Sequence, residues 1–143
     1  MIRISERDEW KLFLDDERTP KDDTWTIART AQEAKDLIAQ KGCPVAIAFD
    51  HDLGYTIPQE MIGKDPRDYP MVKTPIGYFR EGIIIEETGL DFAKWFANQV
   101  LDGAITLPED FAFSVHSSNP EGHKNIQSYM DSFMKHMRES RGE

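Results

Sequence analysis

Acidic side chains form two short clusters, each directly after an apolar run of the sequence. Asp15 and Asp16 make up the first cluster, and Asp50 and Asp52 belong to the second. Carboxylates held close together raise one another's pKa unless a cation neutralises them, and hard divalent ions such as Mg²⁺ and Mn²⁺ prefer oxygen ligands. A single aspartate pair after a strand is more often a solvated turn. Two such clusters favour a cation site.

Histidines accompany the same clusters. His51 lies inside the second cluster, His116 directly follows a third apolar run, and His123 falls in the first turn of the helix predicted after it. Imidazoles beside carboxylates suit proton transfer near neutral pH, or ligation of a transition metal such as Mn²⁺, Fe²⁺ or Zn²⁺. The sequence has one cysteine and no His-x-x-x-His pair, so the spacing does not indicate zinc. We therefore rank acid, base or phosphate donor above metal ligand for these histidines.

A polar turn opens the last predicted helix. Ser117, Ser118 and Asn119 stand where free backbone N–H groups and the positive end of the helix dipole favour an anion. The alternative is an ordinary helix cap, which needs only one of these side chains. Arg18, just after the first acidic pair, is suited equally to clamping a phosphate and to neutralising an aspartate.

The elements that position these groups follow from the hydrophobic pattern. Short apolar runs predict strands, and apolar residues spaced three and four apart predict helices. The predicted strands are Lys11–Leu14, Trp25–Ala28, Val45–Phe49 and Phe111–Val115. The predicted helices are one capped by Thr30 and Glu33 and ended by Gly42, then Gly89–Leu101, then Pro120 to about Met137 with Asn119 as N-cap. Alternation of strands and helices implies a mainly parallel sheet, whose ligands bind outside the carboxyl ends of the strands.

Two features depart from a regular alternation. Only about ten residues separate the first two strands, so the helix between them is expected to be very short or absent. Residues 55–87 contain four of the eight prolines and are expected to be an insertion that forms a lid or a partner surface. Within it, Tyr78–Glu87 is predicted as a hairpin that turns near Glu81 and Gly82, with Ile83–Ile85 as its second strand.

Size and charge exclude several classes of protein. The chain has 143 residues, which is one ordinary domain, and 26 acidic against 17 basic residues give a net charge of −9. This field argues against a broad face for duplex nucleic acid, and a small phosphorylated ligand would need a metal or a local pocket of donors. Cys43 has no partner for an internal disulfide and is assigned no chemistry. Neither a signal peptide nor a membrane span is recognisable, so we expect a cytoplasmic protein.

Four segments together resemble the cyclic-phosphate processing receiver domain, a divergent branch of the receiver fold of two-component signalling. They are 14–20 (LDDERTP), 49–54 (FDHDLG), 88–91 (TGLD) and 115–122 (VHSSNPEG). The resemblance covers nearly the whole chain apart from the 55–87 insertion and the tail. It implies an α/β, receiver-like (flavodoxin-like) three-layer sandwich with a truncated, mostly parallel sheet of about four strands. Residues 1–143 would form a single receiver-like domain.

The resemblance also implies roles for individual residues. Asp15 and Asp16 match the metal-binding acidic pair of receivers, Asp50 matches the phospho-accepting aspartate, and Ser117 is near the hydroxyl position of the following strand. Ordinary receivers carry a lysine at the end of a fifth strand, for which we expect no counterpart. Phosphorelay switching is therefore disfavoured, and the additional histidines at 51 and 116 favour a hydrolytic site.

The leading hypothesis is a metal-dependent phosphoesterase acting on cyclic or terminal phosphates of RNA or nucleotides. Asp15, Asp16 and Asp50 would hold Mg²⁺ or Mn²⁺, although Asp50 could instead attack phosphorus. His116 or His51 would protonate the leaving 2′ or 3′ oxygen, with Asp52 orienting the imidazole. The expected phosphate-binding residues are Ser117, Ser118, Asn119, Arg18 and His123. The alternatives are a non-catalytic module that binds a nucleotide or protein partner, and a phospho-accepting response regulator.

Overall fold

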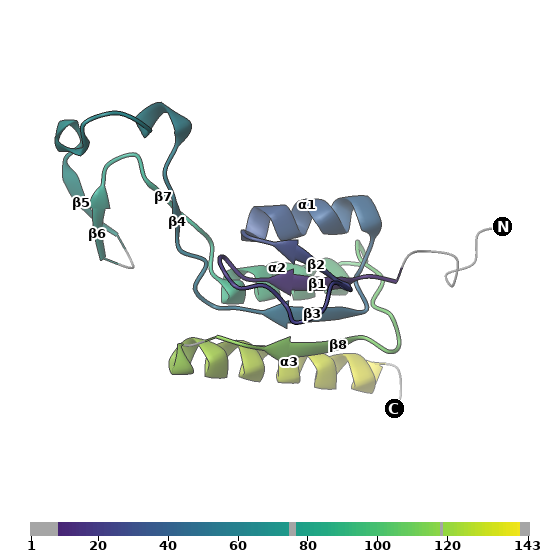
Figure 1. Ribbon diagram of the computed structural model, residues 1–143. Helices are drawn as coiled ribbons and strands as arrows, with labels where there is room; N and C mark the ends of the chain where they lie inside the picture. The colour runs from purple at the N-terminus through teal and green to yellow at the C-terminus, as the bar shows by residue number, and fades with distance from the viewer. Residues whose placement is uncertain (1–8, 75–76, 118, 141–143) are drawn as a thin grey trace. The chain divides into compact units, whose positions relative to one another are not determined.

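A four-stranded parallel sheet is the centre of the fold (Figure 1). The computed structural model describes residues 9–74, 77–117 and 119–140. The strands are β1 (Lys11–Leu14), β2 (Trp25–Ala28), β3 (Ala46–Phe49) and β8 (Ala112–Val115), arranged in the order β2-β1-β3-β8. The four predicted strands are confirmed, with β3 and β8 each beginning one residue later than predicted. From β1 the chain adds β2 on one side of the sheet and then β3 and β8 on the other side. The boundary between β1 and β3 is therefore the switch point at which doubly wound sheets bind ligands.

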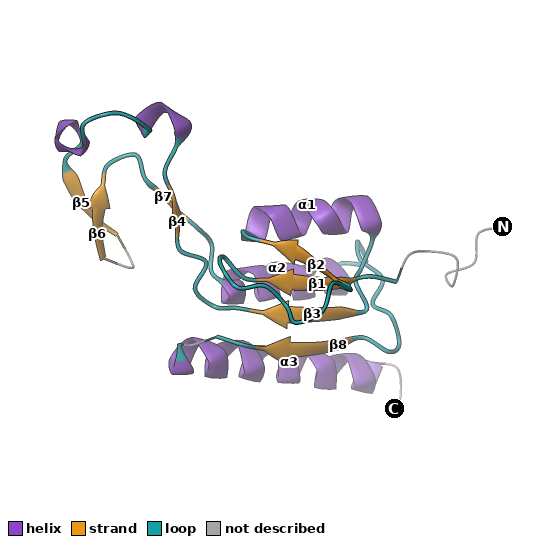
Figure 2. Cartoon of the chain, viewed as in Figure 1, coloured by secondary structure: helices purple, strands orange, loops and turns teal. Residues whose placement is uncertain are grey.

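Three helices connect and follow these strands (Figure 2). They are α1 (Ala31–Lys41), α2 (Gly89–Leu101) and α3 (Pro120–Ser140), so α3 extends three residues beyond the predicted Met137. The Thr30 side chain accepts the Glu33 N–H at 3.1 Å as predicted. The Glu33 carboxylate, however, accepts the N–H of Arg29 rather than that of Thr30. Gly42 ends α1 with a positive φ of 85°, which glycine adopts without strain.

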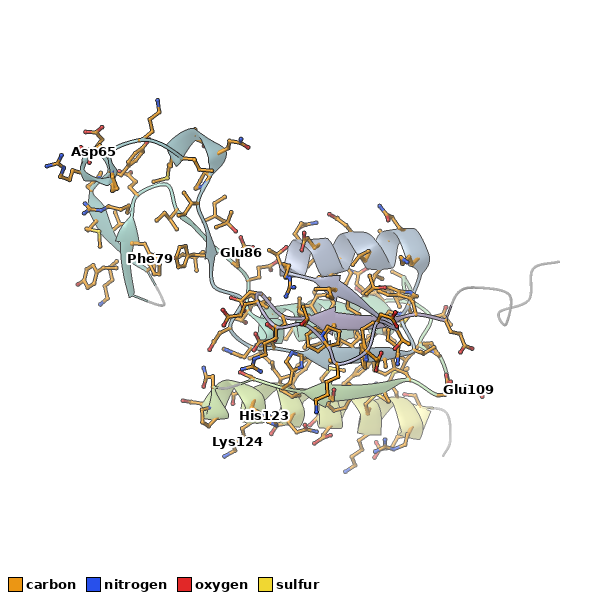
Figure 3. All side chains as sticks on the ribbon, in the orientation of Figure 1. Asp65, Phe79, Glu86, Glu109, His123 and Lys124 are labelled. Carbon is orange, nitrogen blue, oxygen red and sulfur yellow. The ribbon has the colours of Figure 1, made fainter. Side chains whose placement is uncertain are left out.

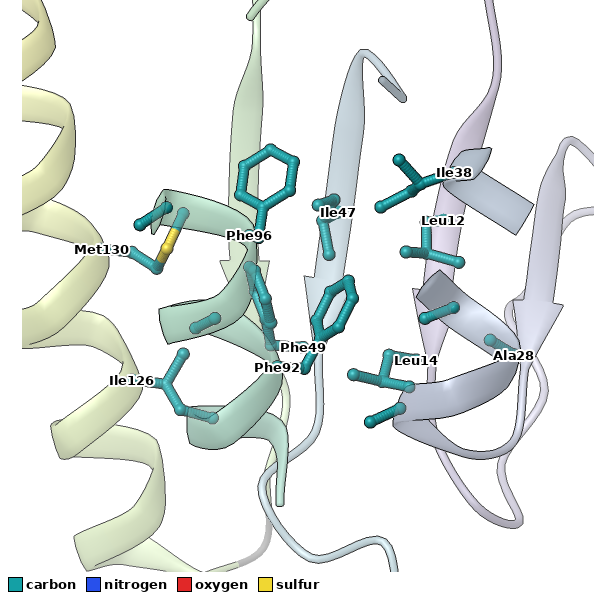
Figure 4. Packing of buried hydrophobic residues seen from close by; sticks show 14 of the residues in the cluster. Leu12, Leu14, Ala28, Ile38, Ile47, Phe49, Phe92, Phe96, Ile126 and Met130 are labelled. Carbon is teal, nitrogen blue, oxygen red and sulfur yellow. The ribbon is translucent and has the colours of Figure 1, made fainter. Parts of the chain in front are cut away.

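The core lies between one face of the sheet and the helices. Alternate strand residues such as Leu12, Leu14, Ile47 and Phe49 are fully buried and belong to a cluster with side chains from all three helices. Figure 4 shows several of the contributors, which are Ala28, Ile38, Phe92, Phe96, Ile126 and Met130 together with these four. Burying each large apolar side chain contributes about 1.5–3 kcal/mol, so this cluster holds the sheet and helices together.

The opposite face of the sheet has a different character. The connection from β1 to β2 contains no helix over residues 15–24, as expected from its length. Lys11, Phe13, Trp25 and Ile27 project from this face, and the rings of Phe13 and Trp25 meet edge to face with their centroids 6.1 Å apart. Of the three layers expected, the described helices therefore form one, and a loop takes the place of the first crossover helix.

Residues Gly54–Glu86 form a separate compact unit, called the inserted unit below. It corresponds to the segment 55–87 that the sequence marked as an insertion. Its strands are β4 (Tyr55–Thr56), β5 (Met71–Thr74), β6 (Gly77–Arg80) and β7 (Ile84–Ile85), with 3₁₀ turns η2 (Gln59–Met61) and η3 (Pro66–Asp68). The N–H of Glu86 donates to the carbonyl of Gly54 at 3.1 Å, next to the β4–β7 pair.

The predicted hairpin within this unit is wrong. The chain turns at Glu81 and Gly82, but β6 pairs with β5 and β7 pairs with β4, both antiparallel. The β5–β6 pairing aligns four residue pairs, including Val72 with Phe79, whereas the isoleucine run supplies a strand of only two residues. Because each cross-strand pair adds stability, the longer pairing of β6 with β5 is favoured over a pairing of β6 with the isoleucine run.

Within the described residues, no helix has the length and apolar character needed to cross a membrane.

Candidate metal and phosphate site

Three carboxylates meet at the switch point of the sheet. Asp15 follows β1 and Asp50 follows β3, and one oxygen from each of Asp15, Asp16 and Asp50 lies within 4.8 Å of the others. Asp15 is fully buried and Asp50 is 6% exposed, whereas Asp16 is exposed. The fold therefore brings together the three residues that the sequence predicted as metal ligands.

The two oxygens of Asp15 have different environments. Its Oδ1 accepts the backbone N–H groups of Glu17 at 3.0 Å and Arg18 at 2.8 Å. Its Oδ2 is buried and has no hydrogen-bond partner among the described residues. Oδ1 therefore anchors the loop. A buried acceptor without a partner costs about 1–3 kcal/mol, so a ligand that bound to Oδ2 would remove this cost.

The protonation equilibria of the cluster favour the same interpretation. Burial, followed by the negative charges of Asp15 and Asp16, raises the pKa of Asp50 to about 6. Burial also raises the pKa of Asp16, and the charge of Asp15 adds to this effect. A divalent cation would offset both costs, because it replaces lost hydration and neutralises the repulsion. The donor set, all carboxylate oxygens, fits a hard ion such as Mg²⁺ or Mn²⁺.

His116 lies beside Asp15. Its Nε2 is 3.0 Å from Asp15 Oδ2, but the contact lacks the geometry of a hydrogen bond, and both ring nitrogens are buried. The imidazole stacks on Phe13 with the ring centroids 4.6 Å apart and the planes 8° from parallel. Burial lowers the pKa of His116 even though Asp15 opposes this shift. Burial therefore disfavours the charged form of His116, and the stack on Phe13 sets the position of its ring.

Two arginines tie the loop after β1 to its surroundings. Arg18 donates to the backbone carbonyl of His116, and its Nε lies 3.9 Å from Asp15 Oδ2. Arg29 donates to the carbonyl of Asp15 at 3.2 Å and to that of Arg18 at 2.5 Å. Sequence reasoning missed Arg29. Its only signal was a basic residue immediately before the first predicted helix, and nothing local showed that it reaches back to another strand.

His51 belongs to a second polar group. Its Nδ1 lies 2.7 Å from Asp52 Oδ1, and Asp52 Oδ2 accepts a long hydrogen bond of 3.4 Å from the Asn119 amide. Asn119 Oδ1 in turn accepts the N–H of Gly122 at 3.0 Å, which makes it the N-cap of α3 as predicted. With Nδ1 held by a carboxylate, Nε2 is the ring atom that can exchange a proton with a ligand. Asp52 thus orients His51 and not His116.

Two glycines permit this arrangement. A β-carbon on Gly122 would lie 2.4 Å from Cγ of His51, and one on Gly89 would lie 1.8 Å from the carbonyl oxygen of Asp50. The Gly89 N–H also donates to the carbonyl of His51 at 2.8 Å. Sequence reasoning gave neither glycine a role. Their signal was their presence in two of the four segments that carry the family resemblance.

The expected phosphate-binding residues have varied environments. The Ser117 hydroxyl accepts the N–H of Asn119 at 3.1 Å, so it supports the turn. His123 lies in the first turn of α3 (Figure 3), and its backbone N–H donates to the carbonyl of Asn119 at 2.8 Å. Ser118 lies outside the described residues. Ser117, Asn119 and Arg18 therefore already bond within the protein, and phosphate contacts from these residues stay a prediction.

Comparison with known proteins adds one finding. The family model of the cyclic-phosphate processing receiver domain matches residues 10–132, a span that includes both acidic clusters, His116 and Gly122. Neither the curated proteins nor the solved structures yield a significant match. The matched span covers most of the chain, and the strand order and parallel pairing are those of a receiver-like α/β fold. The chain belongs to the cyclic-phosphate processing receiver domain family.

Proposed function

We propose that this protein is a metal-dependent phosphoesterase that acts on cyclic or terminal phosphates of RNA or nucleotides. Membership of a cyclic-phosphate processing family supports the phosphate chemistry. The observation that carries the metal dependence is Oδ2 of Asp15, which is buried and without a hydrogen-bond partner beside Asp16 and Asp50. His116 Nε2 lies 3.0 Å from this oxygen without hydrogen-bond geometry, and the oxygens grouped with it belong to carboxylates. A cation is the ligand that such a set of oxygens suits best.

Asp15, Asp16 and Asp50 would hold Mg²⁺ or Mn²⁺. When bound, such an ion supplies positive charge to the oxygens of a phosphate ester. The near-complete burial of Asp50 argues for the role of ligand over that of nucleophile, because a group that attacks phosphorus must reach the substrate. Arg18, whose side chain is 46% exposed, adds a fixed positive charge at the edge of this cluster.

His51 is the better candidate for proton transfer to the leaving 2′ or 3′ oxygen. Asp52 lies 2.7 Å from Nδ1 of His51 and orients the ring, and general acid–base catalysis requires a positioned side chain of this kind. His116 has both ring nitrogens buried and a lowered pKa, so it is a poor proton donor at neutral pH. Its proposed role is to pack beside Asp15, where the stack on Phe13 keeps its ring 3.0 Å from Oδ2.

The test is hydrolysis of defined substrates. Purified protein with Mn²⁺ is incubated with 2′,3′-cyclic and terminally phosphorylated nucleotides and short RNAs, and release of product is followed by chromatography. His51→Asn should lower turnover by about 100-fold or more, since acid–base groups contribute about 10²–10⁴-fold. Asp15→Asn should also lower turnover, because it removes a proposed ligand of the ion that the reaction needs. Asp23→Asn is the matched control, because Asp23 is an exposed aspartate of the same loop.

Two outcomes contradict the proposal. Tight retention of a nucleotide without turnover would make the protein a binding module. Stable labelling by acetyl phosphate that is abolished by Asp50→Asn would make it a phospho-acceptor.

A further inference from the structure

We propose that the inserted unit is a self-association surface that joins two copies of this chain. This inference is independent of the proposed activity. It rests on the burial, the apolar exposure and the charge of residues Gly54–Glu86.

The inserted unit has no interior of its own. None of its described residues is buried, and its sheets are one pair of two-residue strands and one pair of four-residue strands. An isolated two-stranded sheet is marginally stable in water, and segments below about 40 residues usually need disulfides, metals or oligomerisation. The unit contains no cysteine, so a disulfide does not supply this stability. Burial against another surface would do so.

Apolar side chains are exposed on this unit out of proportion to its length. Of the nine large hydrophobic residues identified as exposed in the described chain, seven belong to these 33 residues. The seven are Tyr55, Ile57, Ile62, Met71, Val72, Tyr78 and Ile84. Ile62 and Tyr78 are the most open, at 66% and 67%. Concentrated apolar exposure of this kind marks an interaction surface.

The same unit contains a pocket of about 280 Å³. Its walls include Ile57, Met61, Ile62, Tyr69 and Ile83, so its lining is largely apolar. Figure 3 draws the side chains of this region, including Phe79, whose ring centroid lies 5.0 Å from that of Tyr55. A pocket of this size and lining accepts an apolar side chain from a partner, which is how buried anchors form at protein interfaces.

The charge distribution favours a protein over a nucleic acid. Five of the seven exposed residues are aliphatic, and stacking on bases requires aromatic rings. Two of the unit's four cations are already engaged: Arg67 pairs with Asp65 at 2.9 Å, and Arg80 donates to the carbonyl of Tyr69 at 3.1 Å. These features do not form the basic groove that single-stranded RNA needs.

The charge balance also favours a second copy as the partner. Four basic and five acidic residues give the inserted unit a net charge of −1, which leaves −8 of the total −9 on the rest of the chain. Two nearly neutral apolar surfaces can meet without repulsion, whereas other faces of two identical acidic chains would repel. Among the described residues no further strand pairs with β5 or β6, so a strand from a second copy could add to this sheet in an isologous contact.

The experiment is sedimentation velocity of the full chain over concentrations of roughly 1–200 µM, because dimerisation depends on protomer concentration. A dimer is expected to form as the concentration rises. Ile62→Asp and Tyr78→Asp should each weaken the dimer by about tenfold or more. Leu101→Asp is the matched control, because Leu101 is 52% exposed in α2 and lies outside the inserted unit. Circular dichroism of each variant verifies that the chain is folded.

Two results would overturn the proposal. One is a wild-type chain that sediments as a monomer at every concentration. The other is a dimer that tolerates both substitutions in the inserted unit. If the wild type is a monomer, fluorescence anisotropy with a labelled single-stranded RNA is measured as well. Loss of RNA affinity in Tyr78→Asp would then reassign this surface to nucleic acid. Metal binding and turnover are measured separately, so failure here is distinguishable from failure of the phosphoesterase proposal.

Discussion

The imidazole of His51 occupies the space that a β-carbon at Gly122 would need, since that carbon would lie 2.4 Å from Cγ of His51. Contact with the first turn of α3 therefore fixes the ring against Asp52. This contact links the sequence of a helix terminus to the orientation of a candidate general acid.

Gly122→Ala should displace His51 while leaving the three carboxylates in place. We expect turnover to fall by about 100-fold, since acid–base catalysis contributes about 10²–10⁴-fold, with little change in Mn²⁺ affinity. Turnover is measured beside Mn²⁺ titration. Ser128→Ala, at an exposed position of the same helix, should change neither quantity. Equal losses of metal affinity and turnover in Gly122→Ala would show that the helix supports the carboxylates instead.

Asp15→Asn separates the two oxygens of Asp15. An asparagine carbonyl can still accept the N–H groups of Glu17 and Arg18, whereas the second position becomes an amide that cannot ligate a cation well. Mn²⁺ affinity should fall by more than the 10- to 100-fold typical of supporting residues, with the unfolding free energy little changed. Electron paramagnetic resonance of free Mn²⁺ gives the affinity, and urea denaturation gives the stability. Undiminished binding would exclude Asp15 as a ligand.

The metal-free protein should lose stability as the pH rises through about 6. The pKa of Asp50 is raised from 3.8 to about 6, so the folded state binds a proton more tightly than the unfolded state. The resulting stabilisation is fully present below pH 3.8 and is lost as the pH rises through about 6. At about 1.4 kcal/mol per pH unit, we expect a decrease of at most about 3 kcal/mol, measured by urea denaturation with a chelator present. Asp50→Asn should flatten this dependence; an unchanged slope would assign it to another group.

Arg29→Ala should loosen the loop that carries the first acidic pair. The substitution removes both donations to the carbonyls of Asp15 and Arg18 without touching a carboxylate. Faster amide hydrogen exchange over residues 16–24 and an Mn²⁺ affinity about 10-fold lower are expected, as for other residues that support metal ligands. Arg29→Lys should recover part of the affinity, because lysine can reach one carbonyl but not both. Unchanged exchange in Arg29→Ala would remove this role.

Most of the main sheet and the carboxylate cluster could be predicted from the sequence. Each strand is a short apolar run followed by polar residues, and parallel strands place their carboxyl ends at one edge. That rule predicts that Asp15 and Asp50 lie together, as they do, and the β1–β2 spacing correctly excludes a long helix between these strands. These are properties of periodicity and connection length, which the sequence records directly.

Side-chain partners could not be predicted in the same way. His51 and His116 both follow strands, and nothing local separates them, yet Asp52 holds one and Phe13 stacks on the other. The partner of each histidine depends on the neighbouring element, which supplies Gly122 beside His51 and the ring of Phe13 beside His116. The hairpin error has a related cause, because which short strands pair depends on competition among several segments of similar propensity.

The bond from Glu86 to Gly54 has a consequence for how this chain can vary. It closes the inserted unit at its base, so the two flanking positions stay adjacent whatever lies between them. The entropy of closing a longer or shorter segment changes only slowly with its length. A segment of different length should therefore be tolerated at this point without a change in the arrangement of Asp15, Asp16 and Asp50.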